Sequence, residues 1–394
     1  MGDDRRVRDA STGPGPHPDT GAPATSSTGS TGSTDPTDTP TLPVPPSPRS
    51  TTLSIAGLVT LVLLTLLVFV PVPYAIGSPG PTRDTLGAYD GEPLIEVDGV
   101  PTYESTGELR MTTVSYAGGP GYPVTLPLVL RGWLSGARVV TPVESVFPPD
   151  RSQDEIDQQN EAEMVSSQEN ATVAALEELG YEVPAELRVA GAVAGTGADG
   201  VVEEGDVLLS LEGEPVESYT ELVRTLARTE PGTTVTLGLV RDGEPLDVDV
   251  VTGERAGGGS QLGVFIDPVF DLPVDVTIQI EDIGGPSAGM MFALGIIDTM
   301  TPEDELDGAV IAGTGTVDVD GKVGPIGGIR QKLFGAVRDG ADWFLAPGAN
   351  CDEVVGNVPD DLRVVRVETL GEARAAMEAI GAGAGDALPT CEAP

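Results

Sequence analysis

The sequence contains a single histidine, and its position limits the catalytic chemistry open to the chain. His17 lies within residues 1–50, which are rich in Ser, Thr, Pro, Gly and Asp. Such a segment buries too little apolar surface to offset the entropy lost on ordering, so we predict a disordered tail at 1–50. A Ser-His-Asp triad, a Cys-His pair and a histidine-ligated zinc site are therefore excluded from the folded part.

Lysine and cysteine are also scarce. Of the 21 lysines and arginines, only two are lysines, Lys322 and Lys332. With no histidine in the folded part, a hydrolase built from this chain must take its base from a carboxylate, a lysine or a metal-bound water. The two cysteines, Cys351 and Cys391, are too few for a metal cluster. The spacing leaves two alternatives open: one disulfide that fastens the C-terminal tail of an exported domain, or two unpaired thiols.

Positive charge is scarce as well, since the formal net charge is -41. Phosphate binding needs clustered Lys and Arg, so nucleic acid is not expected as a partner. The same charge argues against docking onto anionic lipid through a basic surface. An acidic surface keeps a protein soluble and identifies no ligand.

A long apolar run stands out against this composition. Residues 53–70 read LSIAGLVTLVLLTLLVFV and carry no charge, and with Pro71 and Val72 they reach about the 20 residues that span a bilayer. A cleaved signal peptide is the alternative, but its apolar core is shorter, and the residues after Val72 offer no cleavage signal. We predict a retained transmembrane helix at 53–72. Arg49 precedes the span and the body after it is acidic, which favours a cytoplasmic N-terminus and an extracytoplasmic body at the cell membrane.

The rest of the sequence divides into an α/β body and a β-rich module. Residues 108–116 and 138–143 read as strands, 152–180 as a helix, and 272–380 as alternating strands and helices. Between them, short apolar runs alternate with turn signals around one helical stretch, Tyr219–Arg228. The predicted limits are 78–185 for the first part of the body, 186–256 for the module, 257–382 for the second part and 383–394 for a tail.

Two segments of the second part carry candidate chemistry. In the first, a Gly-Gly-Pro turn delivers Ser287 to the start of an apolar helix, where free backbone amides can stabilise an oxyanion. The alternative is a helix-capping serine. In the second, Lys332 opens an apolar helical stretch that can bury its amine, lower its pKa and make it a base for a serine. The alternative is a solvated lysine on the helix surface. This alternative is less favoured because the chain otherwise uses arginine for positive charge, and arginine cannot deprotonate.

These segments resemble the proteolytic domain of the Lon family. The shared features are a Gly-Pro-Ser-Ala-Gly turn at Gly285–Gly289, a Thr-Gly at Thr314, and a Pro-Ile-Gly-Gly stretch at Pro325–Gly328 before Lys332. The resemblance extends to the helical stretch Met164–Leu176. It implies Ser287 as nucleophile, Lys332 as general base and Thr314 as a hydrogen-bond partner of the lysine. It also assigns the nucleophile turn and oxyanion region to Gly285, Pro286, Ala288 and Gly289.

The chain departs from that family in two respects. An acidic residue commonly stands three positions before the serine, where this chain has Gly284. No P-loop is present, because Gly321-Lys322 is followed by Val323 and lacks the first glycine of the motif. Without the family's ATPase domain, we expect ATP-independent cleavage of short or unstructured segments.

The module at 187–252 resembles a PDZ domain of the type found in bacterial proteases. The matching features are Gly205-Asp206-Val-Leu-Leu-Ser-Leu-Glu-Gly213, then Pro231-Gly232 and Arg241-Asp-Gly243. PDZ domains bind extended peptides or C-termini by adding a strand to a sheet edge. Lon-like segments lie on both sides, so the PDZ domain is expected to be inserted into the proteolytic domain. The order of span, PDZ and Lon segments resembles a membrane-anchored bacterial subfamily.

The sequence therefore predicts a membrane-anchored serine endopeptidase with a Ser287–Lys332 dyad, acting on exported or membrane proteins. Its expected partners are protein or peptide substrates, including C-terminal tails captured by the PDZ domain, and the family resemblance implies a hexamer. No cofactor and no metal are expected. The alternatives are a non-catalytic membrane scaffold that uses the PDZ domain on a Lon-like framework, and a regulator that acts on one partner's tail.

Overall fold

The computed structural model describes residues 48–89, 91–119, 121–255, 258–280 and 283–392, so the predicted disordered tail lies almost entirely outside the described residues. Helix α1 (Pro48–Phe69) is the one helix of the described residues that is long and apolar enough to cross a membrane, by length and composition. It ends before the predicted limit at Val72. Pro71 explains this, because proline disfavours helical backbone at the preceding residue and donates no amide.

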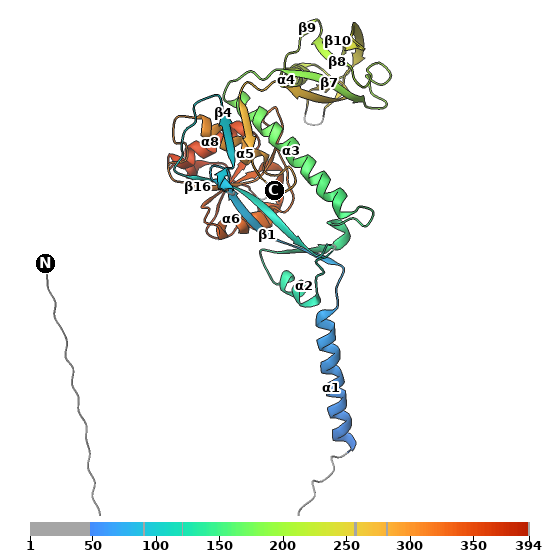
Figure 1. Ribbon diagram of the computed structural model, residues 1–394, viewed down its shortest axis with the longest axis vertical. Coiled ribbons are helices and arrows are strands. Elements are labelled where there is room, and N and C mark those ends of the chain that lie inside the picture. The colour runs from blue at the N-terminus through green and yellow to red at the C-terminus, as the bar shows by residue number, and fades with distance from the viewer. Residues whose placement is uncertain (1–47, 90, 120, 256–257, 281–282, 393–394) are drawn as a thin grey trace, which may run out of the picture. The chain divides into compact units, whose positions relative to one another are not determined.

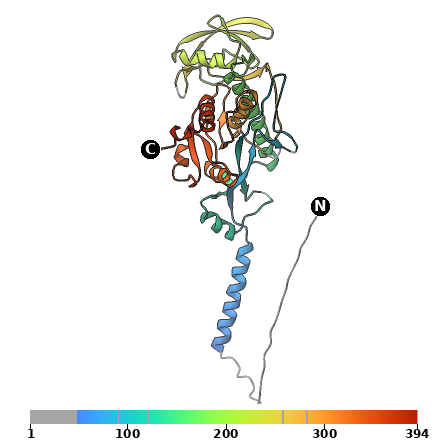
Figure 2. The ribbon, with the colours of Figure 1, turned by 90° about the vertical axis from the view of Figure 1, so that its left-hand side faces the viewer.

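The centre of the body is a six-stranded mixed sheet in the order β20-β19-β16-β5-β1-β6. Its first three strands in sequence pair antiparallel, and its last three run parallel to β5 and to one another. Blue and red strands lie in one body in both ribbon views (Figures 1 and 2), so segments from both ends of the sequence complete one sheet. These strands are β1 (Tyr74–Asp84), β5 (Glu108–Ala117), β6 (Val139–Pro142), β16 (Val310–Gly313), β19 (Trp343–Pro347) and β20 (Arg363–Val367).

The parallel strands are apolar at nearly every position because both faces of the sheet are covered. Alternate residues enter two cores. Ile311 and Leu345 pack with α3, α5 and α8 on one face, whereas Ala312 and Phe344 pack with α6 and α7 on the other. The covering helices are α3 (Gln153–Glu178), α5 (Gly289–Met300), α6 (Ile329–Arg338), α7 (Cys351–Val354) and α8 (Leu370–Gly381).

Helix α5 is the central helix of the larger core. Every residue from Gly289 to Asp298 is buried, which explains why this stretch reads as apolar without an amphipathic period. Helix α3 differs, since its first half is polar and exposed. It begins with a capping box between Ser152 and Glu155 and buries a run of residues in its second half, Ala171–Leu176.

The middle of the sequence forms a second sheet, in the order β11-β10-β8-β7-β14 with β9 beside β8. Helix α4 (Tyr219–Arg228) coincides with the helical stretch predicted there, and Leu222 and Leu226 enter the core of this module. Strand β14 follows the predicted Gly-rich hinge and pairs with β7, so the sheet continues past residue 256. The strands are β7 (Ala185–Ala192), β8 (Val207–Leu211), β9 (Glu214–Pro215), β10 (Thr234–Arg241), β11 (Glu244–Val251) and β14 (Val264–Phe270).

Short elements complete the described part of the chain. Four two-stranded sheets connect the main ones: β2 with β3, β4 with β15, β12 with β13, and β17 with β18. Their bounds, with those of the remaining helices, are β2 (Ala88–Tyr89), β3 (Glu92–Pro93), β4 (Ile95–Asp98), β12 (Gly253–Glu254), β13 (Ser260–Gln261), β15 (Asp275–Ile278), β17 (Thr316–Val317), β18 (Val323–Gly324), α2 (Leu126–Trp133), η1 (Val143–Ser145), η2 (Gly348–Asn350) and η3 (Gly385–Ala387).

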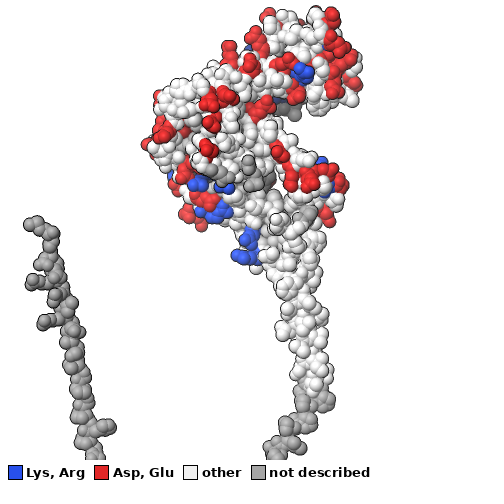
Figure 3. Space-filling view, in the orientation of Figure 1, with Lys and Arg blue, Asp and Glu red and all other residues white. Residues whose placement is uncertain are grey.

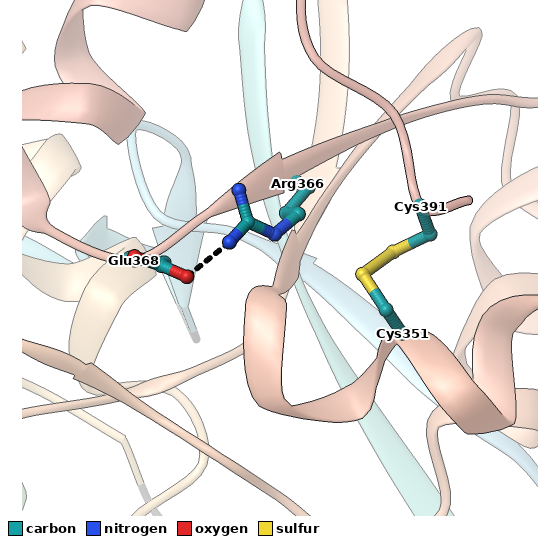
Figure 4. Close-up of a disulfide and its surroundings, with 4 residues drawn as sticks. All are labelled: Cys351, Arg366, Glu368 and Cys391. Atoms are coloured by element: carbon teal, nitrogen blue, oxygen red, sulfur yellow. Dashed lines mark hydrogen bonds and ion pairs between the residues drawn. A yellow bond between two sulfur atoms is a disulfide. The ribbon is translucent and has the colours of Figure 1, made fainter. Parts of the chain in front are cut away.

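The two cysteines are joined in a disulfide, which decides between the two alternatives left open by the sequence. Cys351 begins α7 and Cys391 lies in the C-terminal tail (Figure 4). The tail is also hydrogen-bonded to the sheet, because the Arg366 amide donates to the Pro389 carbonyl at 2.9 Å. Arg366 in turn forms an ion pair with Glu368 beside the disulfide. The disulfide therefore fastens the tail to α7, and the hydrogen bond fastens it to the edge strand β20.

A buried ion pair holds the module formed by β7–β11 together. The Asp206 side chain is fully buried, and Arg241 at the end of β10 donates to both of its oxygens, from Nε at 2.8 Å and from Nη2 at 2.7 Å. These bonds hold the pKa of the Asp206 carboxyl below its ordinary value. The stabilisation is thus present at neutral pH and is lost as the pH falls through that lowered pKa.

Replacing Arg241 with alanine is expected to destabilise this module, because an unpaired carboxylate would remain buried. Arg188→Ala is the matched control, since Arg188 and its partner Glu186 are both exposed and such pairs contribute little. Thermal unfolding of the full chain in detergent at pH 7 measures the difference. Equal midpoints for the two variants would show that the buried pair contributes no more than the exposed one.

Candidate active site

The residues predicted to form the nucleophile turn lie immediately before α5. Gly285 has φ +87°, a left-handed conformation that favours glycine. The helix begins at Gly289 with Ala288 as its N-cap and has no side-chain cap. Ser287 is therefore one residue outside the cap, and its half-buried hydroxyl is not used to cap the helix. The structure contradicts the alternative of a capping serine.

Helix α3 holds the turn from one side. The Ser167 hydroxyl donates to the Pro286 carbonyl at 3.0 Å, and the Gly285 amide donates to the Asn160 carbonyl at 3.0 Å. The sequence indicated that this helix accompanies the catalytic segment, but it did not identify these two contacts. A serine within a helix gives no signal in sequence that it bonds a turn more than a hundred residues away. Ser167 and Asn160 are thus positioning residues that sequence reasoning missed.

The departure at position 284 has a steric explanation in this structure. A Cβ atom on Gly284 would lie 2.7 Å from the Cβ of Asn160, closer than side chains approach one another. The space in which an acidic side chain would begin is therefore occupied by α3. The family's acidic residue cannot be accommodated here without moving that helix.

The segment after β16 holds the turn from the other side. The Thr314 hydroxyl donates to the Ser287 carbonyl at 2.9 Å, and the Gly315 amide donates to the same oxygen at 2.9 Å. The Met290 amide in turn donates to the Gly315 carbonyl at 3.1 Å. These hydrogen bonds hold the backbone of Ser287 through its carbonyl oxygen. They do not use its hydroxyl, which is available for another partner.

Lys332 reaches this hydroxyl from the first turn of α6. Its Nζ donates to Ser287 Oγ at 2.7 Å and to Thr314 Oγ1 at 2.8 Å, and the side chain is only 3% exposed. Burial lowers the pKa of the Lys332 ammonium to about 7. Gly328, with φ +71°, caps α6 and sets the direction from which the lysine enters. The structure therefore brings together Ser287, Thr314 and Lys332, and it contradicts the alternative of a solvated lysine.

Backbone donors are also available at the turn. Within the described residues, neither the Ser287 amide nor the Ala288 amide donates to another backbone group, whereas the Gly289 amide donates to the Pro286 carbonyl at 3.4 Å. Pro286 has no amide hydrogen. A negative oxygen placed against Ser287 would meet these two amides, which have no backbone acceptor among the described residues, at the N-terminal end of a helix.

An open hollow runs beside the turn. It is lined by the exposed side of α3, by Pro286, and by the segment Thr316–Asp318 that begins at β17. Polar residues are the majority of its lining, but most of its exposed surface is apolar, and its wall includes Pro286, the residue directly before Ser287. In the described part of the chain, no group of three His, Cys, Asp or Glu side chains converges to hold a metal ion.

A serine hydroxyl accepting from a buried lysine amine of lowered pKa defines a serine–lysine site, one of the activated-nucleophile arrangements used in acyl transfer. Comparison with known proteins identifies the domain that carries it. Residues 279–377 match the Lon protease (S16) C-terminal proteolytic domain, and residues 164–252 match the PDZ domain. The chain thus contains a Lon-type serine peptidase domain and a PDZ domain.

Individual relatives cover short parts of the chain. Lon protease 2 of Herpetosiphon aurantiacus is 36% identical over 106 residues, which are 25% of this chain and 13% of that relative. The periplasmic pH-dependent serine endoprotease DegQ of Escherichia coli (strain K12) is 48% identical over 83 residues, which are 21% of this chain and 18% of that relative. The chain therefore matches less than a fifth of the length of either. The crystal structure of the PDZ domain of an SdrC-like protein from Listeria monocytogenes matches with 17% identity and a TM-score of 0.20, covering 21% of this chain and 86% of that one.

Proposed function

We propose that the chain is a membrane-anchored serine endopeptidase with Ser287 as nucleophile and Lys332 as general base. One observation carries the proposal: a buried lysine amine, with a pKa of about 7, lies 2.7 Å from the hydroxyl of a serine that caps no helix. At this pKa a large fraction of the amine is neutral near pH 7. A neutral amine accepts the serine proton, and arginine cannot take that role.

The proposed reaction is a two-step acyl transfer. Lys332 takes the proton of Ser287 as its Oγ attacks a peptide carbonyl, and the Ser287 and Ala288 amides stabilise the oxyanion. The lysine then gives its proton to the departing amine, which leaves an acyl-enzyme that water hydrolyses. Thr314 holds the amine on the side away from the substrate through its 2.8 Å hydrogen bond. The hollow beside Pro286 takes the substrate in an extended form, which favours unstructured segments.

We further propose that α1 anchors the chain and that the body lies outside the cytoplasm. Arg49 precedes the span, which supports a cytoplasmic N-terminus. The disulfide between Cys351 and Cys391 supports an extracytoplasmic body by an independent route, because disulfides persist in oxidising compartments. Exported or membrane proteins are then the substrates within reach.

The PDZ domain is proposed to capture those substrates. A groove runs between α4 and the segment Leu262–Ile266, with apolar walls contributed by Leu222 and Leu226. An extended peptide can add to the strand edge on one side of such a groove and bury a terminal apolar side chain against the helix. Capture would raise the local concentration of a chain end near the active site.

A cleavage assay with Ser287→Ala tests this function. The purified full chain in detergent is given an unstructured fluorogenic peptide without nucleotide, and a fluorophosphonate probe reports the reactive serine. Ser287→Ala is expected to reduce cleavage by at least about 1,000-fold and to abolish labelling. Ser145→Ala, an exposed serine in η1, is the control and should leave both unchanged. Wild-type protein that neither cleaves nor reacts with the probe would favour the scaffold alternative.

A further inference from the structure

Helix α2 lies directly beside the end of the proposed span. Pro71 forms an isolated β-bridge with Thr125, the residue that precedes α2, and the Val72 amide donates to the Val124 carbonyl at 2.9 Å. The chain that leaves α1 is therefore hydrogen-bonded to the chain that enters α2. Any membrane that contains α1 reaches its boundary at the level of this contact.

The outward face of α2 is apolar. Leu134 is 89% exposed and Trp133 is 58% exposed, and Leu128 and Leu130 are exposed as well. Tyr122, just before the helix, is 78% exposed. Few large side chains of the body are so open to solvent, and grouped exposed apolar residues mark interaction surfaces.

The inward face of α2 fixes the helix in place. Val129 is fully buried, and it packs with Ile76 and Val124 in a small core that Val140 also contacts. Gly132 is buried too, and its position allows the close approach of Val140. The apolar outward face is thus displayed by a packed unit, and it is not a loose segment that could fold back on the body.

The charge around α2 differs from that of the rest of the chain. Of 62 Asp and Glu residues, none occurs between Asp38 and Asp84, and none between Glu108 and Glu144. These two acid-free segments are neighbours in space, because β1 pairs with β5 and β6. Arg131 and Arg138 are the charged residues of the segment 121–138, and Arg330 of α6 donates to the Gly136 carbonyl just after α2. In Figure 3, the surface at the position of α2 is white and blue, while red gathers elsewhere on the visible face.

We propose that α2 and Tyr122 lie in the head-group interface of the membrane leaflet at which α1 ends. The occupant of the apolar face is lipid: Trp and Tyr are the side chains that settle at this depth, carboxylates are kept away from it, and arginine tolerates it. The inference rests on the proposed anchor. Together with the span, α2 would give the body a second attachment to the bilayer.

Quenching of Trp133 by brominated lipid tests the proposal. The chain has two tryptophans, and Trp343 is buried in the body. The full chain is reconstituted in phosphatidylcholine–phosphatidylglycerol vesicles, with and without bromine on the acyl chains near the head group. Wild-type protein is expected to lose most of the Trp133 emission in brominated vesicles. Trp133→Phe, which reports Trp343 alone, should show no loss.

A tryptophan placed in α1 tests membrane insertion of α1 separately from the interfacial placement of α2. Leu61→Trp in the Trp133→Phe chain should be quenched if α1 is inserted. Quenching at residue 61 without quenching at Trp133 overturns the interfacial placement of α2 and leaves the anchor intact. No quenching at either residue overturns both. Trp133 shielded from aqueous acrylamide but untouched by brominated lipid would overturn the lipid assignment in favour of a second copy of the chain.

Discussion

Replacing Lys332 with arginine is expected to reduce peptide cleavage by at least about 1,000-fold, although the positive charge is kept. Arginine stays protonated at every working pH, so it cannot take the Ser287 proton. Lys332→Met should show a similar loss. The chain offers a matched control in Lys322→Arg, because Lys322 is its only other lysine and is exposed. Full activity in Lys332→Arg would show that the lysine is not the base.

The pH profile gives a second measure of the same group. With the Lys332 pKa lowered to about 7 by burial, the amine is protonated below that pH and neutral above it. Cleavage by the wild type should therefore rise with a midpoint near pH 7 and level off above it. The profile is measured as initial rate against pH with one unstructured peptide. A rate that stays constant from pH 5 to pH 9 is incompatible with a lysine base.

Asp298 is a second buried ionisable group, at the other end of the helix that Ser287 precedes. Its side chain is 2% exposed, and neither carboxyl oxygen has a hydrogen-bond partner. Burial, followed by the nearby carboxylate of Glu305, raises the pKa of Asp298 to about 7. Glu305 is paired with Arg374 at 2.8 Å, and the Ser105 hydroxyl donates to Asp304 at 3.0 Å. Asp298 is thus the member of this group with no ion-pair partner among the described residues, and the nearby Ser105 hydroxyl offsets the rise of its pKa only in part.

Asp298→Asn is expected to stabilise the protein at pH 8 by about 4 kcal/mol, reduced by the cost of burying the asparagine amide. The Asp298 carboxyl ionises near pH 4 in the unfolded chain and only near pH 7 in the folded chain. The contribution of this carboxyl to the free energy of unfolding therefore falls as the pH rises from about 4 to about 7, and it is constant above that range. At pH 4 the folded protein carries the neutral acid, which asparagine imitates, and the difference should be small; at pH 5 roughly a third of the full difference remains, because the unfolded chain is already ionised.

Urea unfolding of the full chain in detergent at pH 5 and pH 8 measures this effect. Asp307→Asn is the control, since Asp307 is exposed and asparagine tolerates its positive φ of 44°. The gain should appear only for Asp298→Asn, and it should be roughly three times larger at pH 8 than at pH 5. The same stability change at both pH values would show that the pKa of Asp298 is not raised in the folded protein, because the folded and unfolded chains would then bind equal numbers of protons across this range.

The residues proposed as the dyad could be singled out from the sequence because local patterns mark them. Gly285 suits a left-handed turn, an apolar helix follows Ser287, and Lys332 is one of only two lysines in a chain that otherwise uses arginine. Helix α4 could be predicted for the same reason, since its cap and period are contained in its own residues.

Other features depend on contacts between distant segments. That Asn160 excludes a side chain at position 284 follows from where α3 crosses the turn, which no local pattern encodes. That β14 joins the sheet of the PDZ domain follows from its pairing with β7, although a Gly-rich hinge precedes it. The pairing of Cys351 with Cys391 was open because connectivity depends on the folded path of the tail.

The pairing of Ser287 Oγ and Lys332 Nζ has a consequence for inhibitor chemistry. A neutral amine condenses with an aldehyde to form an imine and release water, and a serine hydroxyl adds to the empty orbital of a boronic acid. At 2.7 Å apart, the two atoms can react with one small molecule that carries both groups on neighbouring carbons. Lys322, the only other lysine of the sequence, is exposed, and only Lys332 donates to the Ser287 hydroxyl among the described residues, so such a reagent would be bound twice at one place.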